Sequence, residues 1–142
     1  MNDTDNEALS ISFGHPERER LEFVFPSSGR PIQGWFHPTV TVSSGPFSGS
    51  TNAYCELSDF ARLLPELQRL YDELRGTATF ATIERQIGFT LTGDGLGHIE
   101  LRGFFDDRAG GDNRLNFSIS FDQTLLWHSI PEIRDFLDAN PQ

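Results

Sequence analysis

Residues 88–122 read GFTLTGDGLGHIELRGFFDDRAGGDNRLNFSISFD, and this stretch decides the fold. Apolar and polar residues alternate along three runs in it, at Phe89–Thr92, His98–Arg102 and Leu115–Phe121. A period of two places the apolar side chains on one face of each strand, as in an antiparallel sheet whose other face meets water. Such a sheet needs a second layer of structure over its apolar face.

Two turn-forming segments connect these runs. Residues 93–98 hold three glycines in five positions, which suits a tight reversal with positive φ, and we expect Gly95 to adopt it. The second connection, residues 106–113, is rich in Asp, Gly and Asn. The stretch is therefore predicted to be a three-stranded meander.

A repeating apolar pattern predicts a helix before this sheet. Apolar residues recur at alternating steps of three and four at Leu57, Phe60, Leu64, Leu67, Tyr71 and Leu74. The spacing gathers them on one stripe, which we expect to lie on the sheet. We expect a helix from Ser58 as N-cap to Arg75, with Gly76 as its left-handed stop. Pro65 predicts a kink or a split within it.

A second helix is expected at the C-terminus. Ser129-Ile-Pro-Glu132 has the spacing of a capping box, and Asn140-Pro141 stops the pattern. Strands are predicted at residues 9–13 and 21–25 as a hairpin, in the region 32–44, at 53–55 and at 78–83. Pro38 indicates an edge or a bulge, and residues 45–50 read as a loop.

These elements predict an α+β fold in a single domain spanning residues 1–142. We expect a largely antiparallel meander sheet of about six to eight strands, with two helices packed on one face. Residues 1–7 are polar and without apolar periodicity, and are expected to be disordered. Thirteen phenylalanines provide for a dense core.

Composition narrows the classes of function. The chain has formal charge −10, and its 11 basic residues are all arginine, so lysine Schiff-base chemistry and a phosphate-loop lysine are excluded. An acidic protein is repelled by nucleic acid, and direct binding to it is not expected. The single cysteine, Cys55, allows no internal disulfide and no cysteine-based zinc site. No apolar run could span a membrane and the start is acidic, so a cytoplasmic location is expected.

Several residue groups have side chains that could carry chemistry. His98 beside Asp94 could be a metal pair or a base with its orienting carboxylate, or simply the start of a strand. The glycine run at 93–97 precedes a strand, whereas a dinucleotide fingerprint precedes a helix. Ser48 and Ser50 do not fit the Gly-x-Ser-x-Gly spacing of a hydrolase. We expect no catalytic residue, no metal and no cofactor.

The same stretch carries a family resemblance. Leu91–Leu101, then Asn113–Phe117, then Asp122–Leu126 resemble the WapI-type immunity proteins of bacterial polymorphic-toxin systems. The resemblance extends from about Pro46 to Leu137. It implies a small cytoplasmic protein that protects the producing cell from a toxin domain.

From this resemblance we expect an immunity protein that binds and neutralises the C-terminal domain of its cognate toxin. The negative charge is compatible with a basic toxin such as a nuclease. The acidic residues expected to contact it are Asp106, Asp107 and Asp112 in the long connection, and, as a competing patch, Asp135 and Asp138 in the terminal helix. The alternative is a non-enzymatic α+β domain that binds a small apolar molecule or serves as an adaptor.

Overall fold

The computed structural model describes residues 9–26 and 34–140. The expectation for residues 1–7, and the beginning of the strand region expected from residue 32, lie outside these ranges. The described elements, in chain order, are β1 (Leu9–Gly14), β2 (Arg20–Phe25), β3 (Trp35–Phe36), β4 (Thr39–Ser44), β5 (Phe47–Asn52), β6 (Cys55–Glu56), α1 (Leu57–Glu73), β7 (Arg75–Ala81), β8 (Ile87–Asp94), β9 (His98–Asp106), β10 (Arg114–Asp122), the short 3-10 turn η2 (Gln123–Leu125) and α2 (Leu126–Ala139).

The strands form two four-stranded antiparallel sheets and a two-stranded ribbon. The first sheet has the order β1-β2-β4-β5, the second β10-β9-β8-β7, and β3 pairs with β6. The α+β class is confirmed, and so are the predicted hairpin β1–β2 and the meander β8–β9–β10. The expectation of one sheet is wrong, because a chain segment containing α1 separates the two sets of strands and lets them face each other.

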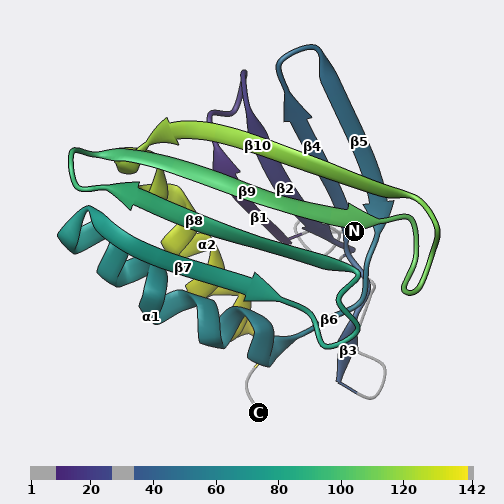
Figure 1. Cartoon of the computed structure of the whole chain (residues 1–142). Helices are drawn as coiled ribbons and strands as arrows, with labels where there is room; N and C mark the ends of the chain where they lie inside the picture. The colour runs from purple at the N-terminus through teal and green to yellow at the C-terminus, as the bar shows by residue number, and fades with distance from the viewer. Residues whose placement is uncertain (1–8, 27–33, 141–142) are drawn as a thin grey trace, which may run out of the picture.

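Aromatic side chains fill the space between the two sheets. The Phe23 ring of the first sheet lies 5.5 Å from that of Phe80 in the second, and Phe13 lies 5.4 Å from Phe89. These residues come from the apolar positions of the alternating pattern, as burial on one sheet face requires. In Figure 1 the strands of the two sheets cross, α1 runs along β7, and α2 lies behind it, beside β1.

Both helices complete this core on one side of the molecule. Phe60 of α1 lies 5.4 Å from Phe136 of α2, and Phe136 stacks on Phe25 of β2 at 4.4 Å. In α1 the fully buried stripe is Phe60, Leu63, Leu67 and Leu70. The predicted residues Leu57, Leu64 and Tyr71 are partly buried beside it. The stripe is therefore rotated slightly from the one predicted.

The ends of the helices differ from the prediction. The N-cap of α1 is Glu56, whose backbone N–H donates to Asp59 Oδ2 at 2.8 Å in a capping box, so Ser58 is not the cap. At the other end Leu74, with φ of 66°, adopts the left-handed conformation expected of Gly76. Pro65 lies within a continuous helix. Ser129 lies inside α2, which begins at Leu126, so the predicted capping box there is also wrong.

The region between β4 and β6 also differs. Gly45 and Pro46 form a two-residue turn, and the expected loop at 45–50 is mostly the strand β5. Pro38 lies before β4, which pairs on both sides and is not an edge. The two sheets approach each other closely at Gly49 of β5, because a Cβ at this position would lie 2.5 Å from the Leu115 side chain of β10. The predicted positive φ of Gly95 is confirmed at 85°.

Candidate functional site

Asp106, the first of the five acidic residues predicted to contact a partner, is not an exposed loop residue. It ends β9, its side chain is 8% exposed, and it accepts from Arg114 Nε at 2.7 Å and Nη2 at 3.1 Å. The register pairs these two residues directly across the hairpin. Arg114 also covers the Phe104 ring, 3.9 Å from its centroid. The placement of Asp106 in the long connection, as a residue available to a partner, is therefore wrong.

Asp107 and Asp112 do lie in the exposed connection. Asp107 Oδ2 accepts a hydrogen bond of 2.9 Å from Asn113 Nδ2, and this bond lowers the pKa of the Asp107 carboxyl below its ordinary value. Its carbonyl accepts from Thr51 of β5 at 3.1 Å, which fixes the connection beside that strand. The connection thus presents an ionised carboxylate at a defined place.

Asp135 and Asp138, in the last turns of α2, are exposed. Carboxylates near a helix C-terminus are unfavourable by a few tenths of a kcal/mol, because they face the negative end of the helix dipole. The helix α2 packs against β1 and α1, whereas the β9–β10 connection lies beside β5. The structure therefore does not bring the two predicted acidic patches together as one site (Figure 1).

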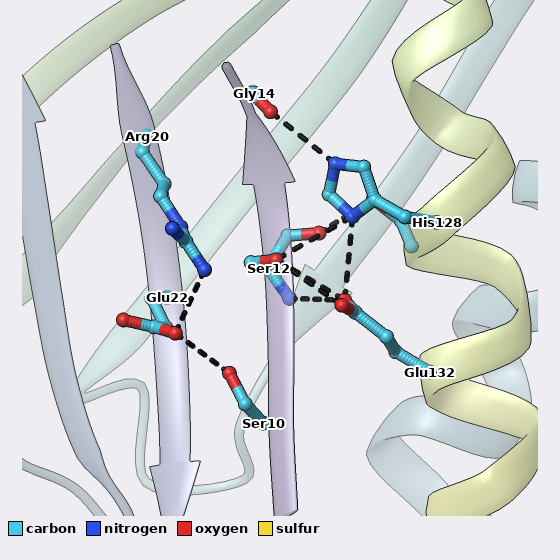
Figure 2. Close-up of polar contacts among 8 residues, drawn as sticks. Ser10, Ser12, Gly14, Arg20, Glu22, His128 and Glu132 are labelled. Atoms are coloured by element: carbon cyan, nitrogen blue, oxygen red, sulfur yellow. Dashed lines mark hydrogen bonds and ion pairs between the residues drawn. The ribbon is translucent and has the colours of Figure 1, made fainter. Parts of the chain in front are cut away.

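A polar cluster joins α2 to the outer edge of β1, and Figure 2 shows it. Glu132 Oε1 accepts from the backbone N–H of Ser12 at 2.8 Å and from its hydroxyl at 3.1 Å. The hydroxyl of Ser129 donates to Ser12 O at 2.5 Å, and His128 Nε2 lies 3.3 Å from Gly14 O. The helix thereby supplies the hydrogen-bond partners that an additional strand would supply to β1.

The pKa of His128 is raised above its ordinary value in this cluster. The main cause is Glu132, whose Oε1 lies 3.5 Å from His128 Nδ1, and the Gly14 carbonyl acts in the same direction. Partial burial and the positive charge of Arg20 oppose the shift. Arg20 itself pairs with Glu22 on β2 at 2.8 Å. Charge on the imidazole therefore strengthens the contact between helix and strand.

Ser12, His128 and Glu132 have the residue types of a catalytic triad but not its geometry. A triad places the nucleophile and the carboxylate on opposite nitrogens of the imidazole ring. Here Ser12 Oγ and Glu132 Oε1 both lie 3.5 Å from Nδ1, and Ser12 is 1% exposed. The cluster therefore has a structural role, which is to connect α2 to β1. The sequence offered one signal of this cluster, the i, i+4 spacing of His128 and Glu132, which was not among the predicted sites.

The glycine-rich turn between β8 and β9 is held by Asp94. Its Oδ1 accepts from the backbone N–H of Leu96 at 2.7 Å and of His98 at 3.1 Å, and these bonds lower its pKa. Asp94 thus contacts the backbone of His98, in keeping with the interpretation of His98 as the start of a strand. Across residues 9–26 and 34–140, no group of three His, Cys, Asp or Glu residues is placed to hold a metal ion.

Three surface hollows follow the outer side of β10. The central one, of about 420 Å³, lies between β5 and β10 and is lined by Phe47, Leu115 and Phe117. A hollow of about 290 Å³ adjoins it toward Asp107, and one of about 620 Å³ lies at the β1–β2 turn, near Glu19 and Asp122. Phe47 is 74% exposed beside the central hollow. Phe47 falls in the segment predicted as a loop and was not among the predicted site residues.

Comparisons with known proteins give one clear match. The model of the immunity protein WapI-like family matches residues 3–141, so the match also includes residues 3–45, which precede the stretch of the sequence resemblance. No curated protein and no solved structure gave a match. Neither helix in the described part of the chain is long and apolar enough to cross a membrane.

Proposed function

Because the chain belongs to the immunity protein WapI-like family and so acts against a toxin, we propose that it does this by direct binding to the toxin's C-terminal domain. The observation that carries the proposal is a family match extending over residues 3–141. The protein would act as a non-enzymatic inhibitor in the cytoplasm of the producing cell. No cofactor is needed for such binding.

The charge of the chain supports a basic toxin as partner. A formal charge of −10 accelerates encounter with a positively charged surface, and nucleases carry such surfaces because they bind phosphate backbones. The same charge disfavours a direct interaction with nucleic acid. We therefore propose that the toxin is basic, with nuclease domains as the first class to test.

Two acidic patches are the candidates for steering this encounter. One is Asp107 with Asp112 beside β5, and the other is Asp135 with Asp138 on α2. Asp106 is left out, since its carboxylate is held by Arg114 inside the hairpin. Exposed charges of this kind raise the association rate more than they slow dissociation, and salt weakens their effect.

The alternative function, binding of a small apolar molecule inside the sheet, has less support. Such a ligand would occupy the concave side of the sheets. That region holds Phe23, Phe60 and Phe80, whose rings lie about 5 Å apart and contact one another. The interior is packed like a protein core rather than lined like a ligand cavity.

Growth rescue tests the proposal. The C-terminal domain of the toxin encoded beside this gene is expressed with and without the protein, and rescue must be accompanied by a complex of the purified proteins. Rescue without a complex would contradict direct binding.

The charge variants are compared in the same binding assay. Asp107→Asn with Asp112→Asn is matched by Asp135→Asn with Asp138→Asn, since each pair removes two exposed charges. We expect one pair to reduce the association rate several-fold at low salt and little at high salt. Equal and small effects of both pairs would remove both patches from the interface.

A further inference from the structure

We propose that the outer edge of β5, together with the groove between β5 and β10, binds an extended segment of the toxin as an added β-strand. The inference rests on the proposed function, because it takes the toxin as the partner. It adds the contact surface and the mode of recognition. Strand addition supplies affinity through backbone hydrogen bonds and specificity through pockets for alternate side chains.

The first argument is the contrast among the four outer strands of the two sheets. On three of them a glutamate accepts from an outward backbone N–H. The pairs are Ser12 with Glu132 on β1 at 2.8 Å, Thr79 with Glu66 on β7 at 2.8 Å, and Ser120 with Glu19 on β10 at 2.9 Å. Within the described chain β5 has no such cap. Its edge is the one left available to a partner.

The second argument is the direction of the β5 backbone groups. Asn52 O accepts from Gln86 Nε2 at 2.9 Å on the side away from β4, so the alternation of an antiparallel ladder also turns Ser48 and Ser50 outward. In the described part of the molecule, no hydrogen bond reaches the backbone groups of Ser48 or Ser50. Both residues are exposed. A strand placed here could exchange hydrogen bonds with both residues.

The third argument is the composition of β5. Its sequence, Phe47-Ser-Gly-Ser-Thr-Asn52, contains no charge and no proline. Charged residues and proline are the residues that soluble proteins commonly place on an exposed edge to prevent other strands from pairing with it. Phe47 is 74% exposed at the beginning of this strand and lies beside the hollow lined by Leu115 and Phe117. An exposed aromatic side chain next to an apolar hollow suits the centre of a binding interface.

The charges around the groove identify the occupant. The central hollow is lined by uncharged residues, but carboxylates line the hollows at both ends: Asp107 at the β9–β10 connection, and Glu17, Glu19 and Asp122 at the other. An arginine also lines each end hollow: Arg114 is already paired with Asp106, and Arg18 leaves the three carboxylates at the other end in excess. This arrangement is complementary to an apolar strand with basic flanks. A second copy of this chain fits less well, because two molecules of charge −10 repel each other.

Proline at Ser48 tests the backbone contact. Ser48→Pro removes an outward N–H but none of the β4–β5 ladder bonds, and Ser48→Ala, which keeps the N–H, is its matched control. Phe47→Ser tests the anchor, with Trp127→Ala as control, since Trp127 is 72% exposed on α2. The probe is the inactivated C-terminal domain of the toxin encoded beside the gene. Ser48→Pro and Phe47→Ser should each raise Kd at least about tenfold, while both controls bind as the parent does.

Hydrogen exchange and the oligomeric state of the chain provide two further tests of the added strand. Should Ser48→Pro lower the melting temperature, hydrogen exchange in the unaltered complex replaces it, and the amides of Ser48 and Ser50 must gain protection on binding. Parent-like affinity of Phe47→Ser together with unprotected amides would overturn the added strand. So would a dimer of the chain alone that Ser48→Pro dissociates, since the edge would then belong to a second copy. Failure of the parent protein to bind would instead refute the proposed function itself.

Discussion

The strands β1 and β5 are the two outer strands of one sheet, and their exposed edges are treated in opposite ways. On β1, Glu132 and Ser129 of α2 take up the backbone N–H and C=O of Ser12. On β5, no hydrogen bond within the described residues reaches the outward backbone groups of Ser48 or Ser50. The comparison teaches that this fold has a simple means of closing an edge, a side chain from a packed helix. Its absence from β5 is therefore informative about function.

The second sheet extends the comparison. On each of its outer strands, β7 and β10, a glutamate also accepts from an outward backbone N–H. These are Glu66 from α1 and Glu19 from the β1–β2 turn. Two of the three glutamates, Glu132 and Glu66, thus come from helices packed on the core, and Glu19 comes from a hairpin turn. The edge of β5 lies on the other side of the molecule from α2 (Figure 1).

The largest expected effect is a difference in stability between variants of two phenylalanines, one next to β1 and one on β5. Phe136 anchors α2 beside β1, is 1% exposed and stacks on Phe25, whereas Phe47 is exposed on β5. Phe136→Ala should lower the free energy of unfolding by about 3–5 kcal/mol, the usual loss for a buried aromatic ring. Phe47→Ala should change it by less than about 0.5 kcal/mol. Urea denaturation measures both, and similar losses would mean that the β5 side is also part of the core.

The next effect concerns the edge contact itself. Glu132→Ala leaves the Ser12 N–H without its acceptor and should destabilise the protein by about 1–3 kcal/mol. Glu132→Gln keeps an acceptor and should be milder. Ser50→Ala, on the open edge, should be neutral within about 0.5 kcal/mol in the same urea series. A neutral Glu132→Ala would show that α2 packing alone closes β1.

A smaller effect distinguishes two neighbouring aspartates next to the open edge. Asp106→Asn weakens the pair with Arg114 and should lower the free energy of unfolding by about 1 kcal/mol, because Arg114 is half exposed and solvent screens the interaction. Asp107→Asn should melt like the parent, since Asp107 is exposed. Thermal or urea melts compare the two, and a reversed order would refute our placement of Asp106.

The smallest effect is the pH dependence of the closed edge. Because the pKa of His128 is raised in the folded state, its contribution is fully present below the unfolded pKa of about 6.5 and is lost as pH rises through the folded pKa. The stability difference between the parent and His128→Asn should therefore shrink from pH 5.5 to pH 8. Glu132 and Arg20 also face this group, so Glu132→Gln should flatten the difference. A constant difference would mean that the imidazole does not titrate in this contact.

The elements of this fold follow largely from local pattern. Alternation at Leu115–Phe121 and the glycines around Gly95 specify strands and a turn, because side-chain direction and φ are decided within a few residues. The helix ends were predicted less well. Ser58 and Ser129 both have the chemistry of a cap. Ser58, however, is the second residue of α1, and the hydroxyl of Ser129 donates to the carbonyl of Ser12, 117 positions away in the sequence.

For the acidic residues too, the sequence predicted the element but not the burial or the neighbours. The sequence placed Asp106, Asp107 and Asp112 in one loop, yet pairing across the hairpin takes Asp106 out of solvent and leaves Asp107 and Asp112 exposed. Asp135 and Asp138 were correctly placed on a helix, but nothing local could tell which strand that helix would pack against. Whether any of these residues contacts a toxin stays a prediction.

By itself, the sequence determined most of the secondary structure, though not β5 or the helix ends, and it determined the α+β class, the acidic charge and the family, because these depend on neighbouring residues or on composition. Only the tertiary structure decided that the strands divide into two sheets, that a glutamate accepts from an outward backbone N–H on three of the outer strands, and that β5 has no such acceptor among residues 9–26 and 34–140. The physical reason is that a sheet edge is closed by groups distant in the sequence. Ser12 and Glu132, for example, are brought within 2.8 Å only when α2 packs on the core.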